Sequence, residues 1–279
     1  MACDRIHGAA WLSRQSLSVL KLCIQQSQAG SGARLVADLR DAALRLAEAR
    51  PAMAPVVNLV ARLHYEVLAR SRQGVDVVAL KGWAQARADG IAFAAKRAAG
   101  RAARRAAEIV RDGDVIASAS HSANVVGALL AARGRGIRFQ VLIARSNASG
   151  ISYGERMANE LAEGGVEVSV VPDASLGRRL AGATAAIIGA DTVLPGGSII
   201  NGTPSLRLAR AAGRSGVPLL VVCETIKFSS RSRPHLEPGF DLIPADLVTR
   251  IMTERGPASP DYLARRARTV ERYLKSLGL

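Results

Sequence analysis

The sequence predicts an α/β protein in which an N-terminal all-helical domain is followed by a Rossmann-like parallel-sheet domain. Three observations support this fold class. Residues from about 10 to 110 place apolar side chains at helical spacing, with almost no β-branched alternation. After Asp112-Gly113-Asp114, short β-rich runs alternate with helix-length segments. Several of these runs are nearly continuously apolar, as in strands covered on both faces. We therefore expect domains at 1–110 and 111–279.

The first hundred residues divide into helical segments. Residues 33–50 carry apolar side chains at helical spacing, and Pro51 and Pro55 interrupt the pattern. A further helix is expected over 56–71. Residues 91–111 form a long Ala/Arg segment in which one face carries arginines and the other carries small apolar residues. The simplest interpretation of the arginine face is a solvated helix surface.

The second half follows the pattern of a parallel sheet. Strands are expected at 115–118, 137–143, 166–171, 185–188 and 217–222. Helix-length segments lie between most of them, at 123–133, 153–163 and 204–214. Strand–helix alternation of this kind predicts right-handed crossovers and a doubly covered sheet.

The composition excludes several classes of protein. The chain has 279 residues, of which 49% are hydrophobic, so it can bury a core and is neither disordered nor collagen-like. The longest strongly apolar run, 217–223, is far shorter than the ~20 residues that span a bilayer. The three cysteines are scattered and form no C-x-x-C. We expect a cytoplasmic protein with no membrane partner, no cofactor and no metal.

The charge is strongly positive but does not identify a partner. The 38 Lys and Arg residues against 23 Asp and Glu give a net charge of +15. Most of the basic residues are arginines spread over predicted helix faces, and aromatic residues make up only 4% of the chain. A nucleic-acid reader needs a clustered basic surface with a reading element, often aromatic. Nucleic acid is therefore not the expected partner.

The candidate ligand site lies where the predicted strands end. In an open α/β sheet, ligands bind outside the carboxyl ends of the strands, where helix N-termini and loop amides gather. The segments in these positions supply hydroxyls, amides, glycines and a few charges. The candidate ligand-binding residues are Arg145, Gly196, Gly197, Asn201, Gly202, Thr203 and Lys227, and the candidate catalytic residues are Asp191, Ser120 and His121.

Common catalytic and nucleotide motifs are missing from these loops. The sequence has no G-x-x-x-x-G-K-[ST], and its one G-x-G, at 134–136, precedes a predicted strand instead of following one. Ser120, His121 and Asp191 suggest a hydrolase triad, but Ser120 and His121 are adjacent in sequence and no G-x-S-x-G elbow is present. A polar, phosphate-accepting site remains the better interpretation.

Six collinear segments resemble one family. They are Ile6-His7-Gly8-Ala9, Arg50-Pro51 through Asn58-Leu59, Asp112-Gly113-Asp114-Val115-Ile116, Gly154-Glu155-Arg156-Met157-Ala158 with Glu160-Leu161, Ile188-Gly189-Ala190-Asp191 through Gly197 and Asn201, and Phe240-Asp241-Leu242-Ile243-Pro244 with Ile251-Met252-Thr253-Glu254-Arg255-Gly256. The family joins the regulatory α, β and δ subunits of translation initiation factor two-B to methylthioribose-1-phosphate isomerase and ribose-1,5-bisphosphate isomerase.

The resemblance implies a helical domain on a Rossmann-like domain, a homodimer formed through the latter, and a sugar-phosphate pocket between the two. In the family's isomerases, a Cys and an Asp perform acid–base chemistry for aldose–ketose interconversion. Asp191 stands at the position of that Asp. The family's T-H-C-N motif aligns with residues 118–121, so that Ser120 replaces the thiol.

Further departures concern charge. Gly202 stands where the family has the Lys of N-K, and His7 stands where it has the Arg of I-R-G-A. Arg145 is the nearest counterpart of the loop Arg in E-S-R-P, with two extra residues before Gly154. An unassisted serine hydroxyl is a much poorer acid than a thiol with a pKa near ~8.5. His121 could take over the acid–base role if its loop turned it inward.

Two functions follow as hypotheses. The preferred one is a regulatory, non-catalytic protein of the initiation factor two-B type that binds a phosphorylated sugar or a nucleoside monophosphate in the inter-domain cleft. The alternative is an aldose–ketose isomerase acting on a ribose-1-phosphate derivative, in which Asp191 and either His121 or Ser120 share the proton transfers.

Overall fold

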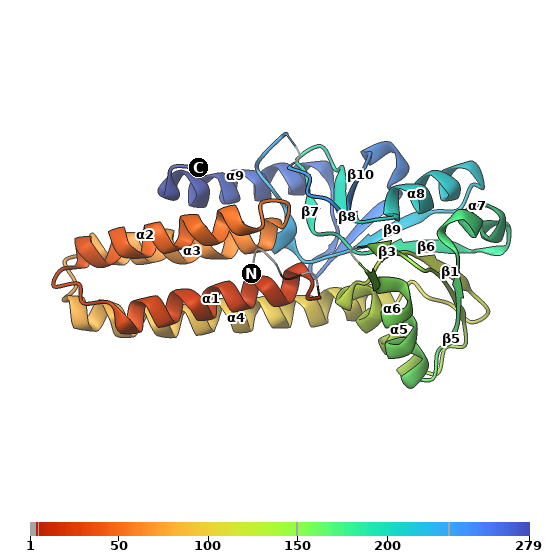
Figure 1. The fold of residues 1–279 in the computed structure, drawn as a ribbon, viewed down its shortest axis with the longest axis horizontal. Helices are drawn as coiled ribbons and strands as arrows, with labels where there is room; N and C mark the ends of the chain where they lie inside the picture. Colours follow the sequence, from red (N-terminus) through yellow and green to blue (C-terminus); the bar gives the residue numbers. More distant parts are fainter. Residues whose placement is uncertain (1–3, 5, 149, 234) are drawn as a thin grey trace.

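The computed structural model describes residue 4 and residues 6–148, 150–233 and 235–279. A helical region lies at one end of the molecule and a sheet region at the other (Figure 1). The helical region contains α1 (Ala9–Gln26), α2 (Gly32–Ala49), α3 (Ala54–Ser71), most of α4 (Val77–Ala107) and the C-terminal helix α9 (Pro260–Leu277). No helix in the described part of the chain is long and apolar enough to cross a membrane.

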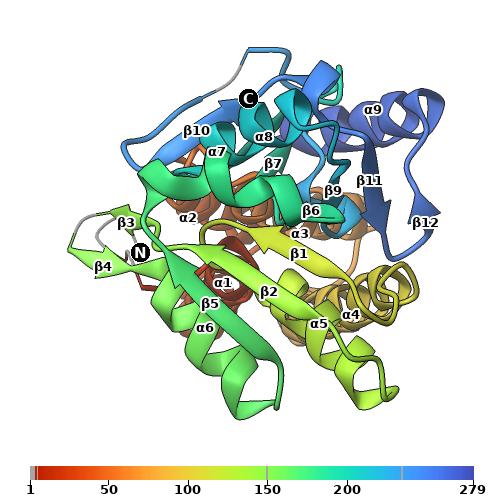
Figure 2. The same ribbon diagram turned by 90° about the vertical axis from the view of Figure 1, so that its right-hand side faces the viewer.

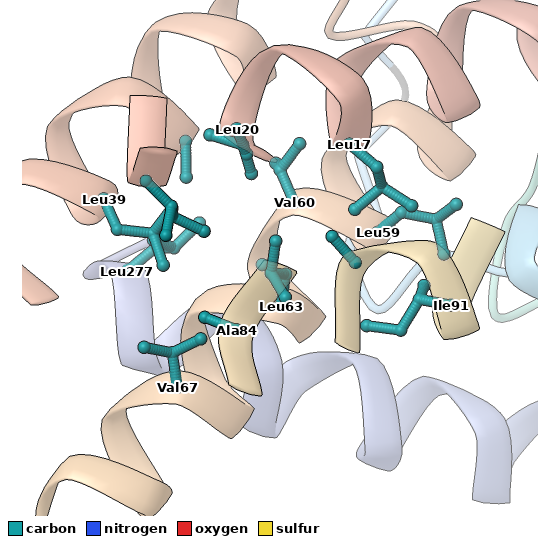
Figure 3. Close-up of a cluster of buried hydrophobic side chains, with 14 of the residues drawn as sticks. Leu17, Leu20, Leu39, Leu59, Val60, Leu63, Val67, Ala84, Ile91 and Leu277 are labelled. Atoms are coloured by element: carbon teal, nitrogen blue, oxygen red, sulfur yellow. The ribbon is translucent and has the colours of Figure 1, made fainter. Parts of the chain in front are cut away.

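The helical region has its own hydrophobic core (Figure 3). Helix α3 lies at the centre of this core, since it packs against α1, α2 and α9. Its buried side chains meet residues contributed by the surrounding helices, which are Leu17, Leu20, Leu39, Ala84, Ile91 and Leu277. Because Leu277 comes from α9, the chain returns to the helical core after the sheet is complete.

Helix α4 connects the two regions. Its 31 residues extend for about 46 Å at 1.5 Å per residue. Ile91 and Ala95 lie in the helical core, whereas Ala103 and Ala106 pack in the core beneath the sheet. The small side chains at this end allow α4 to pack closely on α5 (Ala123–Gly134). The predicted division after residue 110 falls in the segment between α4 and the first strand.

The main sheet has the topology predicted by the alternation of strands and helices. Within the described residues it has seven strands in the order β12-β11-β9-β6-β1-β2-β5, and every neighbouring pair is parallel except β11 and β12. The strands are β1 (Val115–Ser118), β2 (Gln140–Ala144), β5 (Glu167–Val171), β6 (Ala185–Ile188), β9 (Leu219–Val222), β11 (Arg250–Thr253) and β12 (Gly256–Pro257). The parallel strands thus follow the Rossmann order 3-2-1-4-5-6, with the switch point between β1 and β6.

Helices cover both faces of the sheet (Figure 2). One face is covered by α5 and α6 (Tyr153–Glu163), and the other by the short α7 (Leu176–Arg179) and by α8 (Ser205–Arg214). Successive strand residues alternate between the two cores, because Ile187 faces α5 and α6 whereas Ile188 faces α7 and α8. This double burial explains the apolar strand sequences, and the predicted α/β fold class is confirmed.

Short elements were not predicted. A second sheet pairs β7 (Thr192–Val193), β8 (Ile199–Gly202) and β10 (Phe240–Ile243), and a small hairpin pairs β3 (Asn147–Ala148) with β4 (Ile151–Ser152). Short 3₁₀ turns follow at Asp173–Ser175, Leu180–Gly182, Thr225–Lys227 and Ala245–Leu247. The strands β3, β4 and β7 have two residues each, which is too few to show a periodicity in the sequence. Strand β11 was also missed, because its sequence, Arg250-Ile251-Met252-Thr253, is neither a continuous apolar run nor an apolar–polar alternation.

Helix α9 is joined to α3 through a buried histidine, which makes stability depend on pH. The Nδ1 atom of His64 lies 3.0 Å from the Ser276 hydroxyl. Burial, with a smaller contribution from the Arg40 guanidinium, lowers the pKa of His64 from 6.5 to about 4. Since the unfolded chain binds this proton more tightly, stability is complete above pH 6.5 and is lost as the pH falls toward 4.

We expect the free energy of unfolding to fall across this window by up to about 1.4 kcal/mol per pH unit more in the wild type than in His64→Gln. Urea titrations at several pH values between 7.5 and 4 measure both slopes. The same pH slope in the two proteins would contradict the role assigned to His64.

Candidate functional site

A cavity lies at the switch point of the sheet, where the carboxyl ends of β1 and β6 meet the helical region. We call it the inner cavity. The strand ends contribute Ser120, His121 and Asp191, and the helical region contributes Arg50 and Met53. Its remaining lining residues are Ile6, His7, Gly8, Ala148, Tyr153, Gly202, Thr203, Pro238, Gly239 and Phe240. The rule for ligand sites in open α/β sheets places a ligand at this point.

A second hollow adjoins the inner cavity, and we call it the outer cleft. The two share His7, Gly8, His121 and Asp191. The outer cleft is bounded by α1, α4, α6 and the beginning of α5. Four basic side chains line it, namely Arg14, Lys96, Arg156 and Lys227. The cavity and cleft together therefore contain more positive charge than the sequence predicted.

Ser120 sits in an unusual backbone conformation at the end of β1. Its φ angle is 62°, and Ser146 at the end of β2 has a φ of 58°. The Ser120 N–H donates to the Ser146 hydroxyl at 2.8 Å, and the Ser146 N–H donates to Asp173 at 2.8 Å. Left-handed backbone is rare outside glycine and is maintained only when neighbours fix it, often at functional sites. Ser146 therefore holds the loop that carries Ser120, and it was not predicted.

Gly202 lies directly against the Ser120 side chain, and both residues line the inner cavity. A Cβ atom at position 202 would overlap the Ser120 hydroxyl, so the two positions are matched in size. The Asn201 amide next to it donates to Ser205 at 2.8 Å and lines the outer cleft. Thr203 lines the inner cavity, and its N–H donates to the Gly239 carbonyl. The segment 201–203 thus lines the two hollows.

Asp191 follows β6 and faces both hollows. Burial raises the pKa of its carboxyl group, and the positive charges of Lys227 and Arg50 oppose this shift without cancelling it. Lys227 is itself buried. Burial opposes its charge, but Glu224, at 3.4 Å, and Asp191 outweigh this, so that the pKa of Lys227 is raised and the amine stays charged. Asn124 completes this group by donating to Glu224 at 2.8 Å.

Arg50 forms the wall contributed by the helical region. Its side chain is only 2% exposed, its Nε lies 3.1 Å from Glu237, and a further nitrogen donates to the Asp4 carbonyl at 2.7 Å. Nearby, the Thr192 hydroxyl accepts from the Ala54 N–H and donates to the Ala52 carbonyl. These bonds fix the α2–α3 connection against β7. The R-P motif was noted in sequence, but Arg50 was not recognised as a site residue.

His121 turns toward the cavities and is not part of a triad with Ser120. Its Nε2 atom lies 2.9 Å from the Glu160 carboxylate on α6. Burial lowers the pKa of His121, Glu160 opposes this shift, and Arg156 adds to it.

His7 stands at the position of the family's arginine. Its ring stacks on Trp11 with 3.7 Å between the ring centroids, and its Nδ1 atom lies 2.9 Å from the Asp4 carboxylate.

Three predicted ligand-binding residues lie elsewhere. Arg145 is exposed and pairs with Glu155 at 3.3 Å. Gly196 and Gly197 form the turn between β7 and β8, where Gly197 has a φ of 87° and donates to the Leu194 carbonyl. None of the three lines the inner cavity or the outer cleft. Glycine and arginine in a strand-end loop were too general a signal to place them.

The site contains carboxyl, hydroxyl, imidazole and amine groups but no thiol among its lining residues. Cys223 lies at the end of β9, fully buried, and burial raises the pKa of its thiol well above its usual range. Within the described ranges, no three His, Cys, Asp or Glu side chains are grouped so as to hold a metal ion. The available chemistry is hydrogen bonding, charge pairing and proton transfer.

The fold and the cavity together define a Rossmann-type α/β protein in which residues of an N-terminal helical region line the cavity at the switch point of the sheet. The chain belongs to the Initiation factor 2 subunit family, whose model matches residues 5–236. This finding confirms the resemblance inferred from the six sequence segments.

Individual relatives carry two kinds of name. The chain is 30% identical over 276 residues to an eIF-2B subunit 2-like translation initiation factor of Pyrococcus abyssi, covering 93% of this chain and 94% of that one. It is 26% identical over 283 residues to ribose 1,5-bisphosphate isomerase of Haloferax volcanii, covering 92% and 85%. The fold is shared with a chain of the tetrameric eIF2B-beta2-delta2 complex from C. thermophilum, with a TM-score of 0.81, 22% identity, and coverage of 95% and 90%.

The raised pKa of Asp191 predicts a stabilising substitution. An ionised carboxylate whose pKa is raised by folding destabilises the native state at pH values above the unfolded value of 3.8. We expect Asp191→Asn to raise the free energy of unfolding at pH 7, and this gain to disappear as the pH falls to about 4.

Urea unfolding of Asp191→Asn at both pH values measures this effect, with the exposed Asp246→Asn as the matched control. A lower stability of Asp191→Asn than of the wild type at pH 7 would show that the carboxylate is stabilised by its neighbours instead.

Proposed function

We propose that this protein binds a phosphorylated sugar or a nucleoside monophosphate between its helical and sheet regions, as a regulatory and non-catalytic member of the eIF-2B type. The observation that carries the proposal is the convergence of Ser120, His121 and Asp191 on one cavity at the switch point. These groups come from two strand ends that are 70 residues apart, and the buried Arg50 closes the cavity from the helical side.

The inner cavity suits the hydroxylated part of the ligand. The Asp191 carboxylate accepts hydrogen bonds, and the Ser120 hydroxyl both donates and accepts. The Thr203 hydroxyl lies on the same wall. Several such groups around a small cavity match the alternating hydroxyls of a sugar better than an apolar ligand.

The outer cleft suits the phosphate. Neither Arg14 nor Lys96 forms an ion pair within the part of the chain that the structure describes, so both are available to an anion. The first turn of α5, capped by Ser122, opens into the same cleft with its amides. A helix N-terminus beside two cations favours a phosphate group.

Two features support binding without turnover. By the sequence resemblance, Ser120 stands at the position where the family's isomerases have a thiol, and an alcohol exchanges protons poorly near neutral pH. Gly202 provides no cation at the position of the family's lysine. A developing oxyanion would therefore lack both of these stabilising groups.

One observation favours isomerisation as a second candidate. Asp191, with its raised pKa, lines the same cavity as His121, which is a competent acid–base group. The similarity to the isomerase of Haloferax volcanii is in line with this arrangement. Conversion of a ribose-1-phosphate derivative to its ketose by the wild type, abolished in Asp191→Asn, would establish this candidate and overturn the non-catalytic proposal.

We further propose that the protein is a cytoplasmic homodimer formed through the sheet region, as the family resemblance implies; the structurally similar chain of the eIF2B-beta2-delta2 complex also assembles with further chains, in a tetramer. Light scattering after gel filtration should give twice the 29.3 kDa chain mass. A mass equal to that of a single chain at micromolar concentration would contradict the dimer.

Ligand binding should appear as thermal stabilisation. Ribose 5-phosphate, ribose 1,5-bisphosphate and AMP are compared with free ribose, since a ligand at 100 times its Kd adds about 2.7 kcal/mol. Lys96→Ala should raise the Kd for a phosphorylated ligand by about 5-fold, or about 1 kcal/mol, because the substitution removes a positive charge from the proposed phosphate position.

The control is Arg101→Ala, an exposed residue on the same helix that lines neither hollow. Its affinity should equal that of the wild type. No stabilisation by any phosphorylated compound would contradict the proposed function, and equal losses in both variants would contradict the phosphate position.

A further inference from the structure

We propose that Glu160 is a positioning residue that fixes the tautomer of His121, so that the imidazole offers its Nδ1 lone pair to a ligand hydroxyl in the cavity. This inference rests on the proposed function and deepens it, because it states which end of the ligand meets His121. Glu160 lies on α6, 39 residues from His121 in sequence.

The hydrogen bond between them determines where the proton lies. The Nε2 atom of His121 is 2.9 Å from a carboxylate oxygen of Glu160. An ionised carboxylate only accepts hydrogen bonds, so Nε2 must carry the hydrogen. The same oxygen lies 3.4 Å from the Arg156 guanidinium, which helps to orient the Glu160 side chain. Arg156 is in turn held by the Ile6 carbonyl at 2.7 Å.

The other ring nitrogen is left for the ligand. Within the described residues, no hydrogen bond is made to His121 Nδ1, and the ring lines both the inner cavity and the outer cleft. The His121 side chain is 13% exposed. Burial lowers the pKa of His121 and favours the neutral ring. A neutral imidazole with its hydrogen on Nε2 is an acceptor at Nδ1.

An acceptor at this position selects one kind of ligand group. A sugar hydroxyl can donate to Nδ1, whereas a phosphate dianion would place its own lone pairs against it. Asp191 lines the same two hollows and is also an acceptor when ionised. The hydroxylated end of the ligand therefore lies at His121 and Asp191, and the phosphate lies toward Arg14 and Lys96.

The tautomer can be measured without any ligand. Long-range proton–nitrogen spectra of uniformly ¹⁵N-labelled protein resolve the four histidines of the chain. We expect His121 to be protonated at Nε2 alone in the wild type and in Glu160→Gln, whose amide oxygen still accepts. Glu160→Ala should give a mixture of tautomers. A wild-type ring protonated at Nδ1 alone would overturn the proposal.

The affinities of the Glu160 variants for ribose 5-phosphate and for inorganic phosphate then test whether the His121 tautomer contributes to ligand binding. Glu160→Ala should weaken the binding of ribose 5-phosphate by 5- to 10-fold without weakening that of inorganic phosphate, because Glu160 lines the outer cleft and its removal takes a negative charge away from there. Glu160→Gln should restore most of the affinity for ribose 5-phosphate. Glu163→Ala, an exposed change on the same helix, is the matched control and should bind as the wild type does. Unchanged binding of ribose 5-phosphate to Glu160→Ala, or equal losses for the sugar phosphate and for phosphate, would overturn the proposal.

Failure of the proposed function and failure of the role assigned to Glu160 give different results. If the wild type binds no phosphorylated compound, the proposed function and the ligand role of His121 both fail, while the spectra still decide the tautomer. If the wild type binds ribose 5-phosphate but the variants do not differ, the proposed function stands and the role of Glu160 is wrong.

Discussion

The buried pair of Arg50 and Glu237 is the contact on which the site depends. A guanidinium that is 2% exposed cannot remain unpaired, because the cost of desolvating it would exceed several kcal/mol. Glu237 supplies the countercharge and also accepts from the Ala52 N–H at 3.1 Å. The pair thereby ties the α2–α3 connection to the loop before β10 and closes the inner cavity on its helical side.

The electrostatics of the cavity follow from this closure. Arg50 and Lys227 both act on Asp191, and Glu237 and Glu224 oppose them, so the carboxyl group lies within a nearly balanced set of buried charges. In such a set burial decides the direction of the shift, and the pKa of Asp191 rises. Of the lysine and arginine side chains that line the two hollows, Arg14 and Lys96 form no ion pair within the described residues, and both lie at the outer cleft. This separates the proposed place for hydroxyls from the proposed place for phosphate.

Much of the fold could be predicted from sequence because its signals are local. Apolar runs located β1 and β6 at their observed bounds, and helical spacing located α6. Ser120, His121, Asp191 and the segment 201–203 followed from one topological rule about strand ends. Gly196, Gly197 and Arg145 satisfied the same rule and yet lie outside both hollows, because the rule selects loops and does not determine which side chains turn inward.

The missing parts of the site depend on contacts between distant residues. Arg50 meets Glu237 across 187 positions, and Glu160 meets His121 across 39. Ser146 meets Ser120 only because β1 and β2 lie side by side in the sheet. No periodicity or spacing records such pairs. The charge was also misjudged for this reason, since Arg14 and Lys96 are separated by 82 residues and face one cleft only after α1 and α4 have packed together.

A crystal structure of the protein with ribose 5-phosphate would show whether a phosphorylated sugar binds at the carboxyl ends of β1 and β6, next to Arg50. We expect the sugar hydroxyls beside Asp191 and His121 in the inner cavity, with the phosphate toward Lys96 and the first turn of α5. Ligand bound at any other place on the chain, or an inner cavity that stays free of sugar at saturating ribose 5-phosphate, would contradict this expectation.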